Sequence, residues 1–240
     1  MIFSQRIISY FIDRCRDRGV VNWGPFAGAP ATEDSLAHCW MRLLGVYEFY
    51  LHPAVEAALL AKPPVVVDVG ASSGYYSIGM AYRLPSSRHF AFEMQEKERE
   101  SLVRTAAKIV TTVNLKGLCT PADLVEIAQS EPRGFLVMDC EGAERELLGE
   151  TVHPYLKNWT ILLEVHDWHA PGAGKEIYER FETTHSIQTL WSRSAGPKEF
   201  HSIVPWPLNI YCSAVLRRTC EEGRGQAGMR FFSMVPKNRP

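Results

Sequence analysis

The spacing of apolar residues along the chain changes at the dipeptide Pro63-Pro64. Before it, apolar positions recur with helical spacing, and the helices that we expect there cover residues 1–12, 34 or 35 through 44, and 53–60. After it, Val65-Val-Val-Asp-Val69 is a continuous run rich in β-branched residues, typical of a parallel strand that is buried on both faces. The pattern therefore predicts a helical N-terminal extension followed by a sheet.

Downstream of that strand, apolar runs of strand length alternate with helical stretches. This alternation indicates β-α-β units, and we predict an α/β protein with a doubly wound, Rossmann-like sheet. The further strands that we expect cover residues 89–94, 111–115, 135–138, 160–165, 187–191 and 229–235, and the helices cover residues 96–109, 121–129, 143–156, 175–184 and 209–218.

The segment after the first strand is the most informative part of the sequence. It reads Asp68-Val-Gly70-Ala-Ser-Ser-Gly74-Tyr-Tyr-Ser77, and such strand-to-helix turns are where α/β folds bind nucleotides. Gly70 and Gly74 let the backbone approach a ligand without a Cβ in the way. The third glycine of the dinucleotide motif G-x-G-x-x-G and the lysine of a phosphate-binding P-loop are missing, which disfavours NAD and ATP.

Two carboxylates flank this turn. Asp68 suits a cationic group and would repel a pyrophosphate. Glu93 closes the second strand, where a carboxylate can accept both hydroxyls of a ribose. Together they favour a cationic nucleoside as the ligand; a structural turn beside a surface carboxylate is the alternative.

Five segments in the first 170 residues share the order and spacing of a known family. They are Tyr47-Glu48, Val67-Asp-Val-Gly-Ala-Ser-Ser-Gly-Tyr-Tyr-Ser77, Ala91-Phe-Glu93, Met138-Asp-Cys-Glu-Gly-Ala-Glu144 with Leu147-Leu148, and Leu162-Leu-Glu-Val-His166. In these segments the chain resembles the FkbM-type family of class I S-adenosylmethionine-dependent methyltransferases. The Asp-x-Glu-Gly-Ala-Glu run is the most family-specific of them.

The resemblance implies a seven-stranded sheet whose last strand runs antiparallel, with S-adenosylmethionine as the cofactor. By this comparison the glycine turn lines the methionine and ribose, Glu93 binds the ribose, and Asp139 faces the transferred methyl group. The cofactor-binding residues that we expect are Asp68, Gly70, Ala71, Ser72, Gly74, Tyr76, Glu93, Met94, Cys119 and Asp139. The chain departs from the family at Met94-Gln95, where Pro-Asn is usual, and in residues 116–120, where many relatives have an acid.

Ionisable side chains follow the fourth and fifth strands, whose ends meet at one edge of a parallel sheet. They are Asp139, Glu141, Glu164, His166 and Asp167. Three interpretations stay open. His166 or Asp139 is a general base for a hydroxyl acceptor, with Glu164 as a further catalytic candidate. Alternatively, Asp139 with Glu164 or Asp167, and His166 with them, holds a divalent cation that orients a diol. In the third, the acids only cap a helix or satisfy buried amides.

Two further histidines, His185 and His201, could approach the same edge of the sheet.

Composition narrows the class of protein. Hydrophobic residues make up 46% and charged residues 22%, as in packed globular domains. The 26 basic and 27 acidic residues give a formal charge of −1, so we expect neither a nucleic-acid nor a membrane partner. The six cysteines form no C-x-x-C pair, and the apolar N-terminal stretch is too short to span a bilayer; we expect a cytoplasmic protein with reduced thiols.

We therefore expect one methyltransferase domain over residues 1–240. Residues 1–60 would be a helical extension or lid, 61–170 the cofactor-binding core and 171–240 the substrate-side part. The expected reaction is O-methylation of a small-molecule hydroxyl, in a sugar or secondary metabolite, and a homodimer is allowed. N-methylation of an amine or peptide, and a non-catalytic cofactor-binding or scaffolding protein, are the alternatives.

Overall fold

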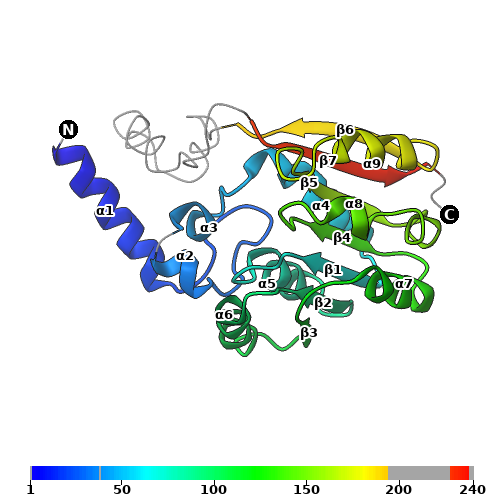
Figure 1. The fold of residues 1–240 in the computed structure, drawn as a ribbon. Coiled ribbons are helices and arrows are strands. Elements are labelled where there is room, and N and C mark those ends of the chain that lie inside the picture. Colours follow the sequence, from blue (N-terminus) through cyan, green and yellow to red (C-terminus); the bar gives the residue numbers. More distant parts are fainter. Residues whose placement is uncertain (1, 38, 194–227, 238–240) are drawn as a thin grey trace.

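The computed structural model describes residues 2–37, 39–193 and 228–237, so the expected helix over residues 209–218 and His201 lie outside it. Figure 1 shows a central sheet with helices on both faces and the N-terminal helices at one end. The strands are β1 (Val65–Val69), β2 (Arg88–Phe92), β3 (Val113–Lys116), β4 (Phe135–Met138), β5 (Thr160–Val165), β6 (His185–Trp191) and β7 (Arg230–Pro236). The helices are α1 (Ile2–Asp17), α2 (Glu33–Ala37), α3 (Trp40–Leu44), α4 (His52–Ala61), α5 (Tyr75–Arg83), α6 (Glu96–Ala106), α7 (Pro121–Ser130), α8 (Glu144–Leu147) and α9 (Ala173–Phe181), with 3-10 turns η1 (Phe49–Leu51) and η2 (His153–Tyr155).

Within the described residues, the sheet has seven strands in the order β3-β2-β1-β4-β5-β7-β6. β1 to β5 pair in parallel, and β7 runs antiparallel to both β5 and β6. This confirms the predicted α/β class and the antiparallel last strand. The chain order reverses between β1 and β4, and such a reversal point in an open sheet is where ligands bind.

Alternation along the strands decides which face of the sheet each side chain joins. Val66 of β1, Val137 of β4 and Leu162 of β5 pack in one core with α4, α5 and the N-terminal extension, and we call this side the α5 face. The intervening strand residues pack against α7, α8 and α9 on the other side, the α9 face. Asp68 and Glu164 share the parity of the first set and therefore belong to the α5 face.

Two close contacts at glycine residues hold the N-terminal extension to the rest of the protein. A Cβ on Gly45, whose φ is +74°, would lie 1.8 Å from the carbonyl oxygen of Trp23, so only glycine lets these segments cross. Phe26 is 1% exposed and lies against Gly79 of α5, where a Cβ would come within 2.3 Å of the ring. The same ring makes edge contacts with Tyr75 and Tyr76, at centroid distances of 5.2 and 5.7 Å.

Two helices are shorter than the sequence pattern predicts. The helix expected through Leu44 is divided into α2 and α3, because Cys39 has φ −103° and ψ 80° outside the helical region. Of the helix expected over residues 143–156, only α8 forms, and the residues after it form turns and η2. Gly149 and Pro154 lie in that stretch, and both residue types disfavour a continuous helix interior.

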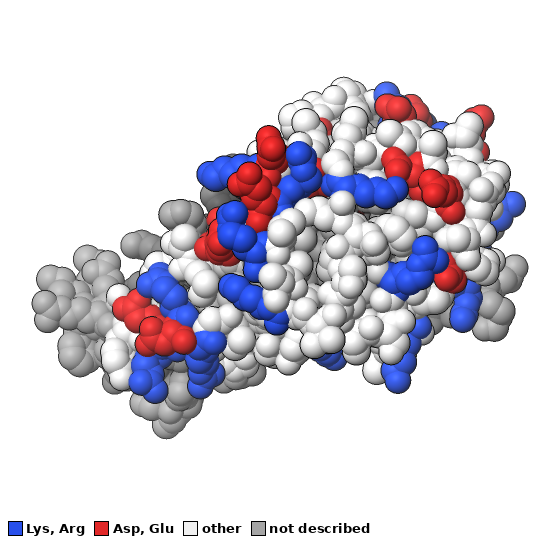
Figure 2. Space-filling view, turned by 90° about the horizontal axis from the view of Figure 1, so that it is seen from below, with Lys and Arg blue, Asp and Glu red and all other residues white. Residues whose placement is uncertain are grey.

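Charged side chains of both signs lie on one face of the molecule, separated by uncharged surface (Figure 2). On the face that Figure 2 shows, lysines and arginines lie beside aspartates and glutamates. Within the described residues, no helix has both the length and the apolar character that crossing a bilayer requires.

Candidate active site

The glycine turn after β1 lies between the ends of β2 and β4. The amides of Gly70 and Ala71 both donate to the carbonyl of Phe92, at 2.9 and 3.0 Å, which fixes the turn to β2. Gly70 has φ +82°, and a Cβ there would lie 1.7 Å from the carbonyl oxygen of Asp139. The turn therefore requires glycine at this position for both conformation and space.

Glu93 points its carboxylate at this turn. Its Oε2 accepts a hydrogen bond from the Ser72 amide at 2.8 Å, and its Oε1 accepts one from the Gln95 amide at 2.7 Å. Glu93 is 6% exposed. A carboxylate has about four acceptor positions, so lone pairs remain for a ligand beside the turn.

Asp68 lies beneath the turn on the α5 face. Ser77 donates its hydroxyl to the Asp68 carboxylate. Burial raises the pKa of Asp68 to about 6, although the hydrogen bonds from Ser77 act in the opposite direction. At neutral pH the side chain is therefore a carboxylate that a cationic ligand would stabilise.

These elements border a pocket that opens to solvent. Its walls come from three places: the N-terminal extension, the glycine turn with α5, and the ends of β4, β5 and β7. The lining residues are Arg42, Tyr47, Glu48, Leu51, Asp68, Gly70, Ala71, Ser72, Tyr75, Tyr76, Val137, Met138, Asp139, Leu162, Glu164 and Phe231. Tyr76 donates its hydroxyl to Glu48 at 2.6 Å, which ties α5 to the extension.

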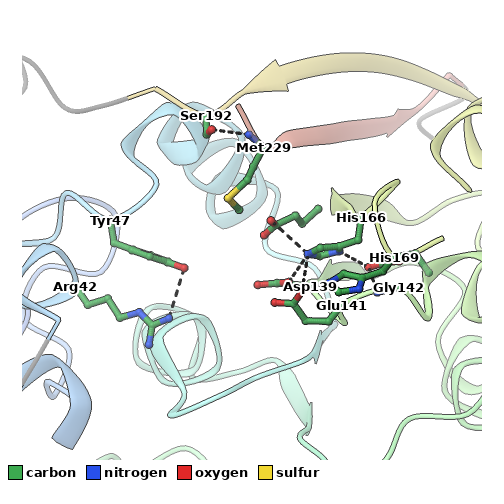
Figure 3. A network of polar contacts seen from close by, with 11 residues as sticks. Arg42, Tyr47, Asp139, Glu141, Gly142, His166, His169, Ser192 and Met229 are labelled. Carbon is green, nitrogen blue, oxygen red and sulfur yellow. Dashed lines mark hydrogen bonds and ion pairs between the residues drawn. The ribbon is translucent and has the colours of Figure 1, made fainter. Parts of the chain in front are cut away.

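A cluster of carboxylates surrounds His166 at the ends of β4 and β5, as Figure 3 shows. The imidazole Nε2 lies 3.4 Å from Asp139 Oδ1 and 3.4 Å from Glu164 Oε1. Its Nδ1 lies 2.5 Å from Glu144 Oε1, and both side chains are 1% exposed. Glu141, which has φ +55°, adds a carboxylate oxygen at 3.5 Å from Nε2.

The cluster shifts the pKa values of two of its members. Burial alone would lower the pKa of His166, but its hydrogen bonds to Glu144 and Glu164 outweigh that effect and raise it to about 10. Burial, followed by the Glu164 charge, raises the pKa of Asp139 to about 8. At neutral pH His166 is therefore an imidazolium and cannot accept a proton. Asp139 is mostly protonated at neutral pH, and its deprotonated fraction, which grows as the pH approaches 8, is the form that can accept one.

The sequence matches no family model and no curated protein. Solved structures do match the fold. The O-methyltransferase from Bacillus cereus in complex with SAH has 13% identity, covers 79% of this chain and 80% of that chain, and has a TM-score of 0.50. Precorrin-6y C5,15-methyltransferase from Geobacter metallireducens GS-15 (19% identity, 75% and 86% covered) and the O-methyltransferase TomG from Streptomyces achromogenes in complex with SAM (14%, 80% and 81%) have TM-scores of 0.48 and 0.47.

The fold is that of the class I methyltransferases. At 13% identity the likeness to the Bacillus cereus enzyme establishes this fold alone.

Within this class I fold, six of the expected cofactor-binding residues line the pocket, and Glu93 lies against its turn. The six are Asp68, Gly70, Ala71, Ser72, Tyr76 and Asp139.

Three other expected residues lie elsewhere. Gly74 faces α6, where a Cβ would meet Leu102 Cγ at 2.9 Å. Met94 is 71% exposed to solvent. Cys119 packs in the core of the α9 face, and burial raises the pKa of its thiol to about 12. Gly74 and Cys119 therefore have roles in packing.

Asp167 and His185 do not join the carboxylate cluster. Asp167 lies in the turn after β5, where it pairs with Arg230 of β7 and accepts a hydrogen bond from the Gly174 amide of α9 at 3.0 Å. His185 begins β6, and its Nε2 lies 2.9 Å from the carbonyl of Trp159. The structure does not bring Asp167 or His185 to the carboxylate cluster, because each side chain has its partners elsewhere.

Sequence reasoning missed two residues of the site. Arg42 comes from α3 in the extension and has no local motif that marks it. Glu144 is not among the ionisable residues expected at the strand ends, yet it holds the Nδ1 side of His166 and accepts a hydrogen bond from the Gly142 amide at 3.1 Å. The Asp-x-Glu-Gly-Ala-Glu motif contains Glu144 but does not say which side chain it contacts.

Proposed function

We propose that this chain is an S-adenosylmethionine-dependent methyltransferase of the FkbM type that methylates a hydroxyl group of a small molecule, such as a sugar or secondary metabolite. The observation that carries the proposal is the carboxylate of Glu93, held 2.8 Å from the Ser72 amide of the glycine turn. A carboxylate in this place can accept the ribose hydroxyls of a nucleoside. The family motifs in the sequence support the same cofactor.

The residues of the pocket fit a cationic nucleoside. Gly70 leaves no side chain between the turn and β4, and the carboxylates of Glu48 and Asp68 attract positive charge. Glu93 would bind the ribose, while Ser72 and Ala71 would lie along the methionine. When bound, S-adenosylmethionine supplies a methyl group on a sulfonium, activated for in-line displacement.

Asp139 is the residue that we assign to remove the acceptor's proton, in preference to His166. The Asp139 side chain is 36% exposed at the pocket, and its Oδ1 has no hydrogen-bond donor among the described residues. His166 is 1% exposed and has carboxylate oxygens beside both ring nitrogens. The histidine therefore positions the carboxylates, and Glu164 forms the adjacent wall.

Binding of the cofactor is the direct test. Isothermal titration calorimetry should show binding of S-adenosylmethionine and S-adenosylhomocysteine, and none of NAD or ATP. Glu93→Gln should weaken binding by at least about tenfold, because one amide-facing oxygen becomes a donor and a charge-assisted ribose contact is lost. Glu126→Gln, an exposed acid on α7, is the matched control and should not change the affinity. No binding by the wild-type protein would overturn the proposal.

The class of acceptor atom is tested by Asp139→Asn. Transfer of a labelled methyl group to a hydroxyl acceptor should fall by at least about a hundredfold, the usual scale of general-base catalysis. Transfer that survives the substitution nearly unchanged would favour an amine acceptor, because an amine needs less deprotonation.

A divalent cation at the carboxylate cluster is a second candidate. One ligand atom each from Asp139, Glu164 and His166 lies within 4.8 Å of the others, a nitrogen-and-oxygen donor set that suits a metal ion. The cation would take the place of the proton on His166 and hold a diol. Titration of Mg²⁺ and Mn²⁺ into chelator-treated protein should then release heat that Glu164→Gln abolishes. Equal heats from both proteins, or none, would exclude a cation held by Glu164.

A further inference from the structure

Arg42 is the one cation among the described residues that line the pocket, and its surroundings are acidic. The pocket also contains Glu48, Asp68, Asp139 and Glu164. An anionic ligand group entering the pocket would be repelled by these carboxylates everywhere except beside the guanidinium.

The Arg42 side chain is buried without a strong partner of its own. It is 16% exposed, and Nη1 makes its one carboxylate contact within the described chain, to the more exposed Asp34 at 3.3 Å. Nη1 also lies 3.4 Å from the Ser73 hydroxyl, and Nη2 lies 3.5 Å from the Tyr47 hydroxyl. The Nε atom is buried and has no hydrogen-bond partner among the described residues. These contacts leave two of the five N–H donors of the guanidinium without a partner among the described residues, one on Nε and one on Nη2.

The position of Arg42 is fixed by packing. Its guanidinium carbon lies 4.6 Å from the centroid of the Tyr47 ring, and that ring packs edge-on against Tyr75 at 5.3 Å. Arg42 therefore reaches the glycine turn at Ser73 from a rigid wall. Figure 3 shows Arg42 and Tyr47 on one side of the site and the His166 cluster on the other.

We infer that Arg42 binds the α-carboxylate of the cofactor's amino-acid end, so that the N-terminal extension is part of the cofactor site. This inference rests on the proposed function. Of the two sources of a carboxylate, cofactor or acceptor, the contact with Ser73 favours the cofactor, because the turn that carries Ser73 is where the methionine end would lie. The ammonium of the same amino-acid end then faces the acids of the pocket, which gives each charge of the zwitterion an opposite partner.

The test compares S-adenosylmethionine with its decarboxylated form, which differs from it only by the carboxylate. Calorimetry on the full chain should show that the wild-type protein prefers S-adenosylmethionine by at least about tenfold, the scale of a hydrogen bond to a charged group. Arg42→Gln should remove this preference while leaving the affinity for the decarboxylated form within about threefold of wild type. Arg104→Gln, which breaks an exposed ion pair between α6 and Glu33 of the extension, is the control and should keep the preference.

The outcomes separate the two proposals. If the wild-type protein binds 5′-methylthioadenosine and both cofactor forms but Arg42→Gln keeps the full preference, the inference about Arg42 fails and the proposed function stands. If the wild-type protein has no preference, the inference fails in the same way. If no nucleoside binds, both fail. Should Arg42→Gln not fold, Arg42→Lys decides, because it keeps the charge and loses the fork: a preference reduced several-fold supports the inference, and an unchanged one overturns it.

Discussion

Replacing Gly79 by alanine would place a methyl group against the ring of Phe26. The new Cβ would lie 2.3, 2.5 and 2.6 Å from three ring carbons, whereas carbon atoms normally approach to about 3.5–4.0 Å. The ring would have to move by more than about 1 Å from a site where it is 1% exposed. Since this contact holds the N-terminal extension to α5, the substitution tests how firmly the extension is attached.

The net change can be worked out from two opposing effects. Alanine in place of glycine in a helix stabilises by about 1 kcal/mol, and overpacking a filled core costs about 1–3 kcal/mol. With all three ring contacts below 3 Å we take the upper part of that range, so Gly79→Ala should destabilise the protein by about 1–2 kcal/mol. Phe26→Ala should cost about 3–5 kcal/mol.

Combining the two substitutions reverses the sign of the first. Once the ring is absent, alanine at position 79 meets no clash and only the helix preference remains, so Gly79→Ala should stabilise the Phe26→Ala protein by about 1 kcal/mol. Urea denaturation of the four proteins measures this coupling. Gly117→Ala, where a Cβ would meet no atom within 4 Å, is the control for a harmless glycine replacement. A Gly79→Ala effect of the same sign and size in both backgrounds would refute the packing of Phe26 on α5.

Three further results are expected. Gly70→Ala should abolish cofactor binding and lower the free energy of unfolding by at least about 2 kcal/mol, because its Cβ meets the Asp139 carbonyl; calorimetry and urea denaturation check this. The pKa of Asp68 is raised to about 6 in the folded protein, so folding favours its protonated form. The free energy of unfolding should therefore fall by about 3 kcal/mol as the pH rises from about 4 to 6. Urea denaturation at each pH, compared between the wild-type protein and Asp68→Asn, isolates this effect. Glu144→Gln should destabilise by about 3–5 kcal/mol because it removes one partner of the buried pair with His166, whereas exposed Glu146→Gln should change stability by less than about 0.5 kcal/mol; equal effects would contradict the pairing.

The sheet could be predicted almost entirely from the sequence because its strands are short apolar runs between helical stretches. β1, β4 and β5 have the predicted bounds, and only the edges of the other strands differ by a few residues. The helices were harder, since their ends depend on single residues such as Cys39 and Gly149. The pattern of apolar positions continues past both, but the backbone does not.

The candidate site could be predicted only in part. Alternation along β5 assigns Glu164 to the α5 face, but the strand ends at Val165 and the rule does not extend to Asp167. The position of Asp167 in the following turn depends on its pairing with Arg230, a tertiary contact. Arg42 had no signal in the sequence either: it lies on a five-residue helix whose position is set by the crossing at Gly45 and by aromatic packing, both of which are tertiary contacts.

The distribution of charge explains why the extension belongs to the proposed active site. The turn and the strand ends supply carboxylates, which suit the sulfonium, the ammonium and the proton of an acceptor hydroxyl, yet they leave an anionic group without a partner. Such a sheet needs a cationic side chain from another part of the chain to pair with the carboxylate of a zwitterionic nucleoside. Of the described residues that line the pocket, Arg42 meets that need, and it is held there by the stack of Phe26, Tyr47 and Tyr75 that joins the extension to α5. Loosening that stack in the Phe26→Ala protein should therefore reduce the preference for the carboxylated cofactor as well as the stability.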